Sequence, residues 1–285
     1  MDTVKNPTQA KTSSIHIRPL AGIMLICAGA ALFLDQQLKT RWLTLMIIPA
    51  AGVILYLLGI RARHAGLTVA GGVMSGFGFG LAAAYNPGLP PQPSLLQVGD
   101  LLLLFGLGWL AVLLGLGWVL KYPVWWALLP FGIFTSAGAS IILTPFHWTD
   151  LALYIGLGIA LPLLAWGIGA RLYGMMIAGS LLVTMGPGLY VAWAPAVKQN
   201  SLAQIGVMLI WFSAGWILIT LISRAMYGQY AWWPLIPGGI LAMVGFGLFI
   251  GGDPSNALGF ISNTGAIGLM IFGLYLLLMR KGIHH

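Results

Sequence analysis

Residues 101–120 read LLLLFGLGWLAVLLGLGWVL, twenty consecutive residues without a charge. About 20 apolar residues in a helix cross the roughly 30 Å hydrocarbon core of a bilayer. Charges and turn residues divide the 285-residue chain into ten such runs, at about 19–35, 43–60, 64–85, 101–120, 123–143, 151–168, 172–194, 203–222, 232–250 and 258–279. Backbone groups in lipid must be satisfied internally, so the runs predict an all-α, polytopic transmembrane helix bundle of about ten helices.

The composition excludes a soluble or nucleic-acid-binding protein. Hydrophobic residues make up 59% of the chain and charged residues only 6%, whereas soluble domains carry about 25% charged residues. The basic residues are scattered singly, so the net charge of +8 indicates contact with anionic lipid headgroups and no nucleic-acid partner. The sequence also lacks a nucleophile motif, a phosphate-binding loop and metal-ligand spacing. We therefore expect no enzyme activity, no cofactor and no metal site.

The distribution of lysine and arginine predicts the orientation of the chain. With the N-terminus in the cytoplasm, ten of the 13 basic residues fall inside and only Lys39, Arg41 and Lys198 fall outside. Such an excess on the inner side is the usual signature of transmembrane topology. We expect a protein of the inner (plasma) membrane with both termini cytoplasmic. Its tails would be residues 1–18 and 281–285, flanking a transmembrane part at 19–280.

The chain also matches itself after a shift of about 107 residues. Residues 105–142 and 212–249 are identical at 11 of 38 positions, including the pairs Trp109/Trp216 and Pro130/Pro237. A shift of 108 pairs Arg63 with Arg171, among others. The period covers four helices, so equivalent helices point the same way. It predicts parallel repeats of four, four and two helices. The units would be about 19–122, 123–230 and 231–280.

Residues 22–60, GIMLICAGAALFLDQQLKTRWLTLMIIPAAGVILYLLGI, resemble the small two-helix bacterial membrane modules of LiaF-type envelope-stress regulators. Residues 230–252, YAWWPLIPGGILAMVGFGLFIGG, resemble the second helix of the same module. The shared pattern is a glycine-rich helix, a polar tip with Asp, an aromatic residue, a Leu-x-Pro or Leu-x-x-Pro step and another glycine-rich helix. The resemblance implies a bacterial membrane protein and brings no catalytic residues with it.

Two stretches of small residues have structural or functional interpretations. Gly72, Gly76 and Gly80 form a small-xxx-small stripe that predicts close packing against another helix. Gly186, Pro187 and Gly188 fall within the run 172–194, where proline removes a hydrogen bond and glycine lowers the resistance to bending. This triplet predicts a distorted helix with a free carbonyl near residue 183. Broken helices form substrate sites in transporters, and a tolerated kink is the alternative.

Four further residues are candidates for caps or binding sites. Asp100 and Asp150 each directly precede an apolar run, where a carboxylate would cap the helix. Asp100 is the more deeply embedded of the two, so it is also a candidate cation or proton site. Trp109 and Trp216 lie deeper than the interfacial tryptophans and are candidate binding residues.

Two functions fit these patterns. The first is a non-catalytic multi-pass membrane protein that acts through helix packing and lateral contacts, as an assembly, sensing or membrane-organising component. Its partners would be the lipid bilayer and another membrane protein subunit or a second copy of itself. The alternative is a secondary transporter of a small neutral or weakly polar solute. Ten helices with both ends inside match drug and metabolite exporters of the EamA type, although those contain inverted five-helix halves. A polar cavity at 186–188 would favour transport, and a closed, dry bundle would favour lateral contacts.

Overall fold

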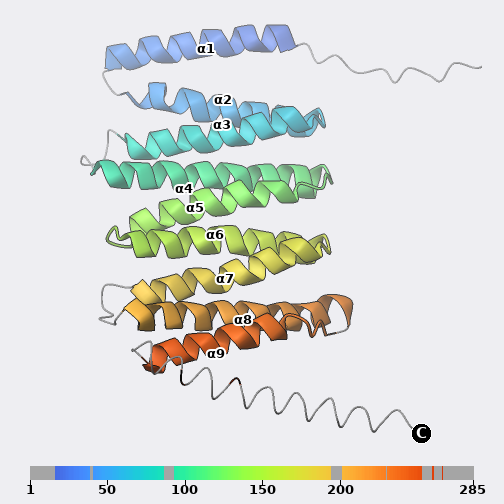
Figure 1. Cartoon of the computed structure of the whole chain (residues 1–285). Coiled ribbons are helices and arrows are strands. Elements are labelled where there is room, and N and C mark those ends of the chain that lie inside the picture. The colour runs from blue at the N-terminus through green and yellow to red at the C-terminus, as the bar shows by residue number, and fades with distance from the viewer. Residues whose placement is uncertain are drawn as a thin grey trace, which may run out of the picture.

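The computed structural model describes residues 17–38, 41–86, 93–193, 201–228, 230–251, 259 and 265. Within these residues the chain is helical and contains no strand. The helices, in chain order (Figure 1), are α1 (Ile17–Leu38), α2 (Trp42–Arg61), α3 (Ala65–Ala84), α4 (Ser94–Leu113), the π-helix η1 (Leu114–Val119), the 3₁₀-helix η2 (Trp125–Ala127), α5 (Leu128–Leu143), α6 (Trp148–Gly169), α7 (Tyr173–Trp193), α8 (Ser201–Tyr227) and α9 (Leu235–Gly251).

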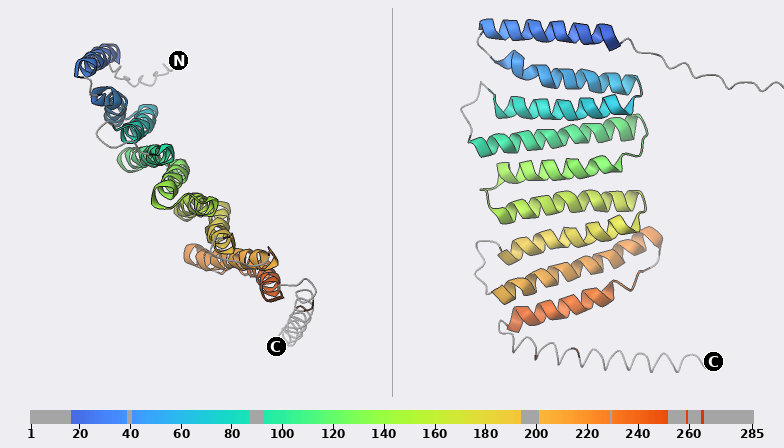
Figure 2. Two further views of the ribbon diagram at one scale, coloured as in Figure 1. Left: turned by 90° about the vertical axis from the view of Figure 1, so that its left-hand side faces the viewer. Right: turned by 45° about the horizontal axis from the view of Figure 1, so that its top comes forward.

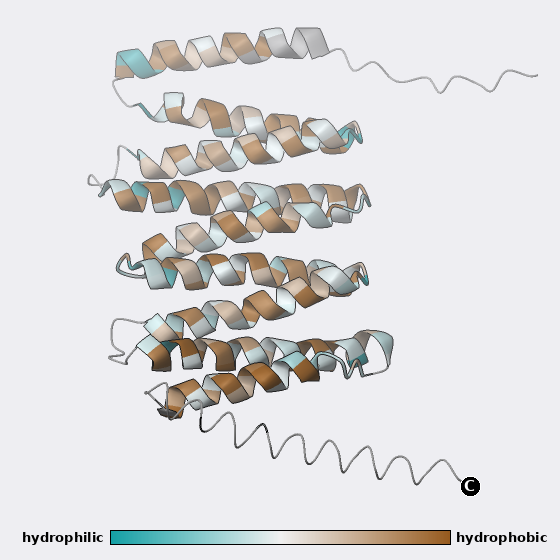
Figure 3. Ribbon diagram, in the orientation of Figure 1, coloured by the Kyte–Doolittle hydropathy of each residue, from teal (hydrophilic) through white to brown (hydrophobic). Residues whose placement is uncertain are grey.

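Seven of the described helices are long and apolar enough to cross a membrane, which makes this a multi-pass transmembrane chain. Shorter apolar segments, Leu25–Leu38 of α1 and Leu235–Ile250 of α9, stand at the two ends of the described series. Apolar residues run along the length of the helices, whereas most polar residues lie near their ends (Figure 3). The tenth predicted span, at 258–279, lies outside the described residues.

The helices stand side by side in chain order and form a slightly zigzag single file (Figure 2). Each helix packs mainly on the helix before it and the helix after it, in antiparallel fashion. The expected bundle is therefore wrong as a description of packing, because the file does not close on itself within the described part of the chain. Short connections favour contact between sequence neighbours, and lipid gives apolar helices no hydrophobic reason to gather further.

Glycines bring the backbones of neighbouring helices into contact. A Cβ added to Gly76 would lie 2.6 Å from the Cα of Gly108, and one added to Gly108 would lie 2.8 Å from the Cα of Gly76. Gly72 and Gly80 also face α4. The predicted stripe on α3 is thus confirmed as a packing surface, and its partner is the next helix in the chain.

The turns α2–α3 and α6–α7 have the same backbone form. Arg63 and Arg171 adopt left-handed conformations with φ of 54° and 53°. In each turn the residue that follows donates its backbone N–H to a carbonyl five positions back, His64 to Gly59 and Leu172 to Gly167. These bonds close the helix in a Schellman motif, and the arginine takes the position that glycine usually occupies.

Asp35 connects the end of α1 to the start of α2. Its carboxylate accepts hydrogen bonds from the backbone N–H groups of Leu43 and Thr44, at 3.3 and 3.2 Å, and from the Thr44 hydroxyl. The side chain is only 5% exposed. The carboxylate therefore satisfies free amide donors in the first turn of α2 and favours the positive end of its dipole.

Candidate functional site

The residues predicted as binding candidates do not come together. Trp109 and Asp100 lie on α4, Trp216 lies on α8, and 186–188 lie on α7. Helices α4 and α8 are separated in the row by α5, α6 and α7 (Figure 1). No single pocket can therefore use all of these side chains.

Helix α7 continues through the triplet at which a distortion was expected. It runs from Tyr173 to Trp193 as one α-helix with Pro187 inside. The flanking glycines fit against opposite neighbours. A Cβ on Gly188 would lie 2.6 Å from the Cβ of Trp211 on α8, while Gly186 is directed at Leu153 and Gly156 of α6. Close packing against α8 explains Gly188, whereas a Cβ at Gly186 would make only ordinary van der Waals contacts, at 3.7 Å or more, with α6.

We expect Pro187→Ala to raise the free energy of unfolding by up to about 3 kcal/mol, because alanine restores a backbone hydrogen bond and suits a helix interior. Denaturant titration of the purified protein in mild detergent measures the change. Pro162→Ala is the control, since the Pro162 ring packs on Gly132 of α5 and its loss offsets part of the gain. A destabilised Pro187→Ala protein would contradict this account.

The two aspartates are not the N-caps that the sequence predicted. Helix α4 begins at Ser94 after Pro93, so Asp100 lies in its second turn, partly buried. The hydropathy pattern placed the start of this helix at residue 101, but the polar residues near 97–100 are already helical. Asp150 is in the first turn of α6, and the N-cap residue is His147. The position of Asp150 still favours the helix dipole.

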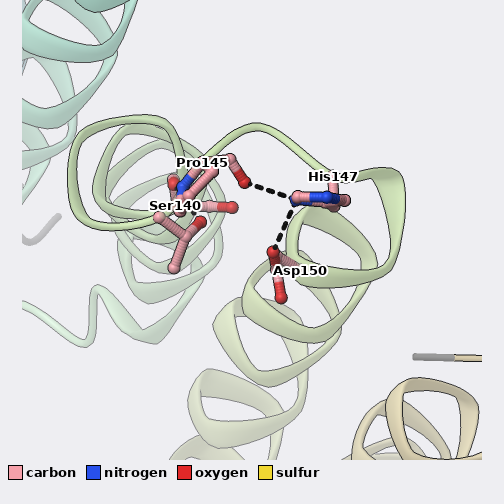
Figure 4. A network of polar contacts seen from close by, with 5 residues as sticks. Ser140, Pro145, His147 and Asp150 are labelled. Carbon is pink, nitrogen blue, oxygen red and sulfur yellow. Dashed lines mark hydrogen bonds and ion pairs between the residues drawn. The ribbon is translucent and has the colours of Figure 1, made fainter. Parts of the chain in front are cut away.

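His147 contacts Asp150 in the connection between α5 and α6 (Figure 4). Its Nδ1 lies 2.8 Å from the carbonyl oxygen of Pro145 and 3.7 Å from a carboxylate oxygen of Asp150. Just after the end of α5, the Thr144 hydroxyl donates a hydrogen bond to the Ser140 carbonyl. Among the described residues no group of three potential ligands could hold a metal ion here. The arrangement orders the loop and starts α6.

Trp109 and Trp216 occupy matching surroundings. Trp109 meets Trp126 edge to face with centroids 5.6 Å apart and an interplanar angle of 79°. Trp216 meets Trp233 in the same way, at 5.8 Å and 78°. Each Trp109 and Trp216 Nε1 is buried and has no hydrogen-bond partner within the described chain. Such aromatic pairs stabilise the packing of the helix end, whereas the unpaired donors oppose it.

A tyrosine hydroxyl interrupts the hydrogen-bond ladder of α4, and the sequence had not singled it out. The Tyr56 hydroxyl on α2 donates to the Ala111 carbonyl at 2.7 Å, and the Gly115 backbone amide bonds to the same hydroxyl. Gly115 leaves room for this approach, because a Cβ there would lie 2.5 Å from the Tyr56 oxygen. The hydroxyl thus contacts both the Ala111 carbonyl and the Gly115 amide, the two groups that a regular α-helix joins directly. A side chain inserted in this way distorts a helix, and the π-helix η1 starts at Leu114, between Ala111 and Gly115.

A pocket of about 670 Å³ lies beside this π-helix. It opens at the α4–α5 connection, where Lys121 adopts a left-handed conformation with φ of 63°. Most of its walls are apolar, and the polar groups are few. The residues that line it are Leu113, Leu114, Gly117, Trp118, Lys121, Tyr122, Pro123, Val124, Trp125, Leu128 and Ala165.

The corresponding part of α8 has neither the π-helix nor the tyrosine. Helix α8 is regular α-helix from Ser201 to Tyr227. The residue 108 positions after Tyr56 is Leu164, and the residue 107 positions after Gly115 is Ile222. Leucine has no hydroxyl to insert and isoleucine leaves no space for one. These departures from the repeat that the sequence predicts are the signal by which the sequence could have indicated the pocket.

No protein-family model, curated protein or solved structure matches this chain. The candidate site therefore has to be interpreted from its own geometry: a mostly apolar pocket with one cationic side chain, at the end of a transmembrane helix.

Proposed function

We propose that the row is assembled from parallel four-helix units about 107 residues long, with the unit boundaries predicted from the sequence. Pairs of contacts separated by that interval support this. Gly71 approaches the backbone of Tyr56 as Gly179 approaches that of Leu164. Gly138 meets the Gly99 carbonyl as Gly245 meets that of Gly206. The left-handed turns and the edge-to-face tryptophan pairs repeat at the same interval.

In this proposal the turns α2–α3, α4–α5 and α6–α7 face the cytoplasm, as do both termini. All three lie on the same side of the row, the right-hand side in Figure 1, and each places a basic residue in a left-handed position: Arg63, Lys121 and Arg171. A cysteine at Leu172 should then be labelled only from the cytoplasmic side and one at Phe146 only from the opposite side, in a Cys27→Ala background. The reverse pattern would refute the orientation.

The protein itself, in our proposal, acts through lateral contacts within the membrane, as an assembly, sensing or membrane-organising component. The observation that supports this is the single file of helices. Large apolar side chains are exposed along the file, such as Leu57 on α2, Leu161 on α6 and Ile217 on α8, which are 58%, 55% and 48% exposed. In a bilayer these side chains meet lipid or other membrane proteins and nothing else. Transport is not proposed, because continuous α7 removes the broken helix on which that hypothesis rested.

Site-specific photo-cross-linking in native membranes tests the function. A photoreactive residue at Leu161 should give a protein adduct of one defined mass, whose yield saturates and which is lost when a bulky residue is placed beside the probe. The matched control is Ile219, which is fully buried and should give intramolecular products only. Lipid adducts alone at Leu57, Leu161 and Ile217 would contradict the proposal.

A further inference from the structure

We infer that the pocket at the π-helical end of α4 binds one anionic phospholipid. The phosphate of the lipid lies at the Lys121 ammonium group, and an acyl chain enters the apolar part of the pocket. This inference is independent of the lateral contacts proposed above, because it concerns a pocket at the α4–α5 connection and not protein contacts along the file.

The shape and lining of the pocket fit such a ligand. Its volume of about 670 Å³ is in the range of small-molecule sites, which are mostly apolar with a few placed polar groups. Leu113, Leu128 and Ala165 provide the apolar wall. Trp118 and Tyr122 line the pocket together with Lys121. Tryptophan and tyrosine are enriched at the membrane interface, where the lipid headgroups lie.

The charge of the pocket decides between classes of lipid. Lys121 is the one lining residue with a formal charge, and no carboxylate is among the lining side chains. Basic pockets between transmembrane helices on the cytoplasmic side favour anionic headgroups. A zwitterionic lipid would place its own cation near the ammonium group and gain less. Charge complementarity therefore favours an anionic phospholipid.

The pocket exists because of Tyr56. Its hydroxyl diverts the α4 ladder, and the resulting π-turns place Gly117 where there is open space on most sides. The residue 107 positions after Gly117 is Arg224, whose guanidinium carbon lies 4.5 Å from the centre of the Tyr230 ring. On α8 this position is therefore filled by an arginine stacked on a tyrosine. On α4 the glycine at position 117 leaves the corresponding space open for a ligand.

Photo-cross-linking with lipid probes tests the site in the full-length protein in mild detergent. The probes are phosphatidylglycerol and phosphatidylcholine with the same diazirine-bearing acyl chain. We expect phosphatidylglycerol to label peptides from 113–128 in preference to phosphatidylcholine. Lys121→Gln should lower labelling by phosphatidylglycerol about tenfold, the size of one lost charge-assisted hydrogen bond, and Lys121→Arg should retain it. The mapping in the wild-type protein stands even where a variant fails to fold.

Two further variants separate the pocket from general surface charge. Tyr56→Phe touches no lining residue, yet it should remove labelling of 113–128 by both lipids because the α-helical ladder closes. Arg224→Gln removes a cation at the matching position of α8 and should leave labelling unchanged. Labelling spread evenly over the outward-facing helices, an equal loss in Arg224→Gln and Lys121→Gln, or release of the lipid by inorganic phosphate alone would each overturn the inference.

Discussion

Gly108→Leu is expected to lower the free energy of unfolding by about 3 kcal/mol, at the upper end of the cost of overpacking. The first atom of the new side chain would lie 2.6 Å from the Gly72 carbonyl oxygen and 2.8 Å from the Gly76 Cα. Both are backbone atoms, so α3 and α4 must separate along the whole contact. Denaturant titration in mild detergent, followed by circular dichroism, measures the loss.

The control for this substitution is Gly239→Leu on α9. A Cβ at Gly239 meets nothing within 4 Å, and the change of glycine to leucine gains the same helix propensity at both positions. The free energy of unfolding of Gly239→Leu should therefore be unchanged or slightly raised. Equal destabilisation by the two leucines would show that the close approach of α3 and α4 is not what holds these helices together.

Asp35→Ala is expected to lower the free energy of unfolding by about 2 kcal/mol and to loosen the contact of α1 with the rest of the row. The carboxylate is buried and accepts two backbone N–H groups and the Thr44 hydroxyl at the start of α2. Loss of an N-terminal cap typically costs about 1 kcal/mol, and hydrogen bonds to a charged acceptor contribute more. The unfolding free energy gives the first effect. The second is measured as faster protease cleavage between α1 and α2.

Asp35→Asn keeps an acceptor oxygen and removes the charge, so it should recover part of the stability. Thr44→Val removes one of the three donors and should cost less than Asp35→Ala. If Asp35→Ala and Thr44→Val destabilised the protein equally, the contribution of the carboxylate would lie in its bond to the Thr44 hydroxyl and not in capping the backbone of α2.

The glycine and tryptophan positions show how far the sequence alone reaches. A run such as 101–120 must be helical in lipid whatever its neighbours are, because the bilayer leaves no other way to satisfy the backbone. The stripe Gly72, Gly76 and Gly80 was recognisable as a packing surface since its spacing is set by the helix itself. Helix ends were less accurate. Asp100 was taken as a boundary, but a helix longer than the hydrocarbon core can carry a charged residue in its second turn.

Only the tertiary structure decided which helices pack against each other. Nothing in a hydropathy pattern says that successive apolar helices form an open file, because lipid and protein surfaces are almost equally apolar and the choice rests on detailed packing. Nor does it say that α7 stays continuous at Pro187, which depends on its fit against α6 and α8. The clearest case is Tyr56. Its hydroxyl bonds to a carbonyl 55 residues later in the chain and changes the form of that helix. The sequence determined where helices form, because that is a local balance between backbone and bilayer, and the tertiary structure determined the pocket, because it depends on two helices meeting at one hydrogen bond.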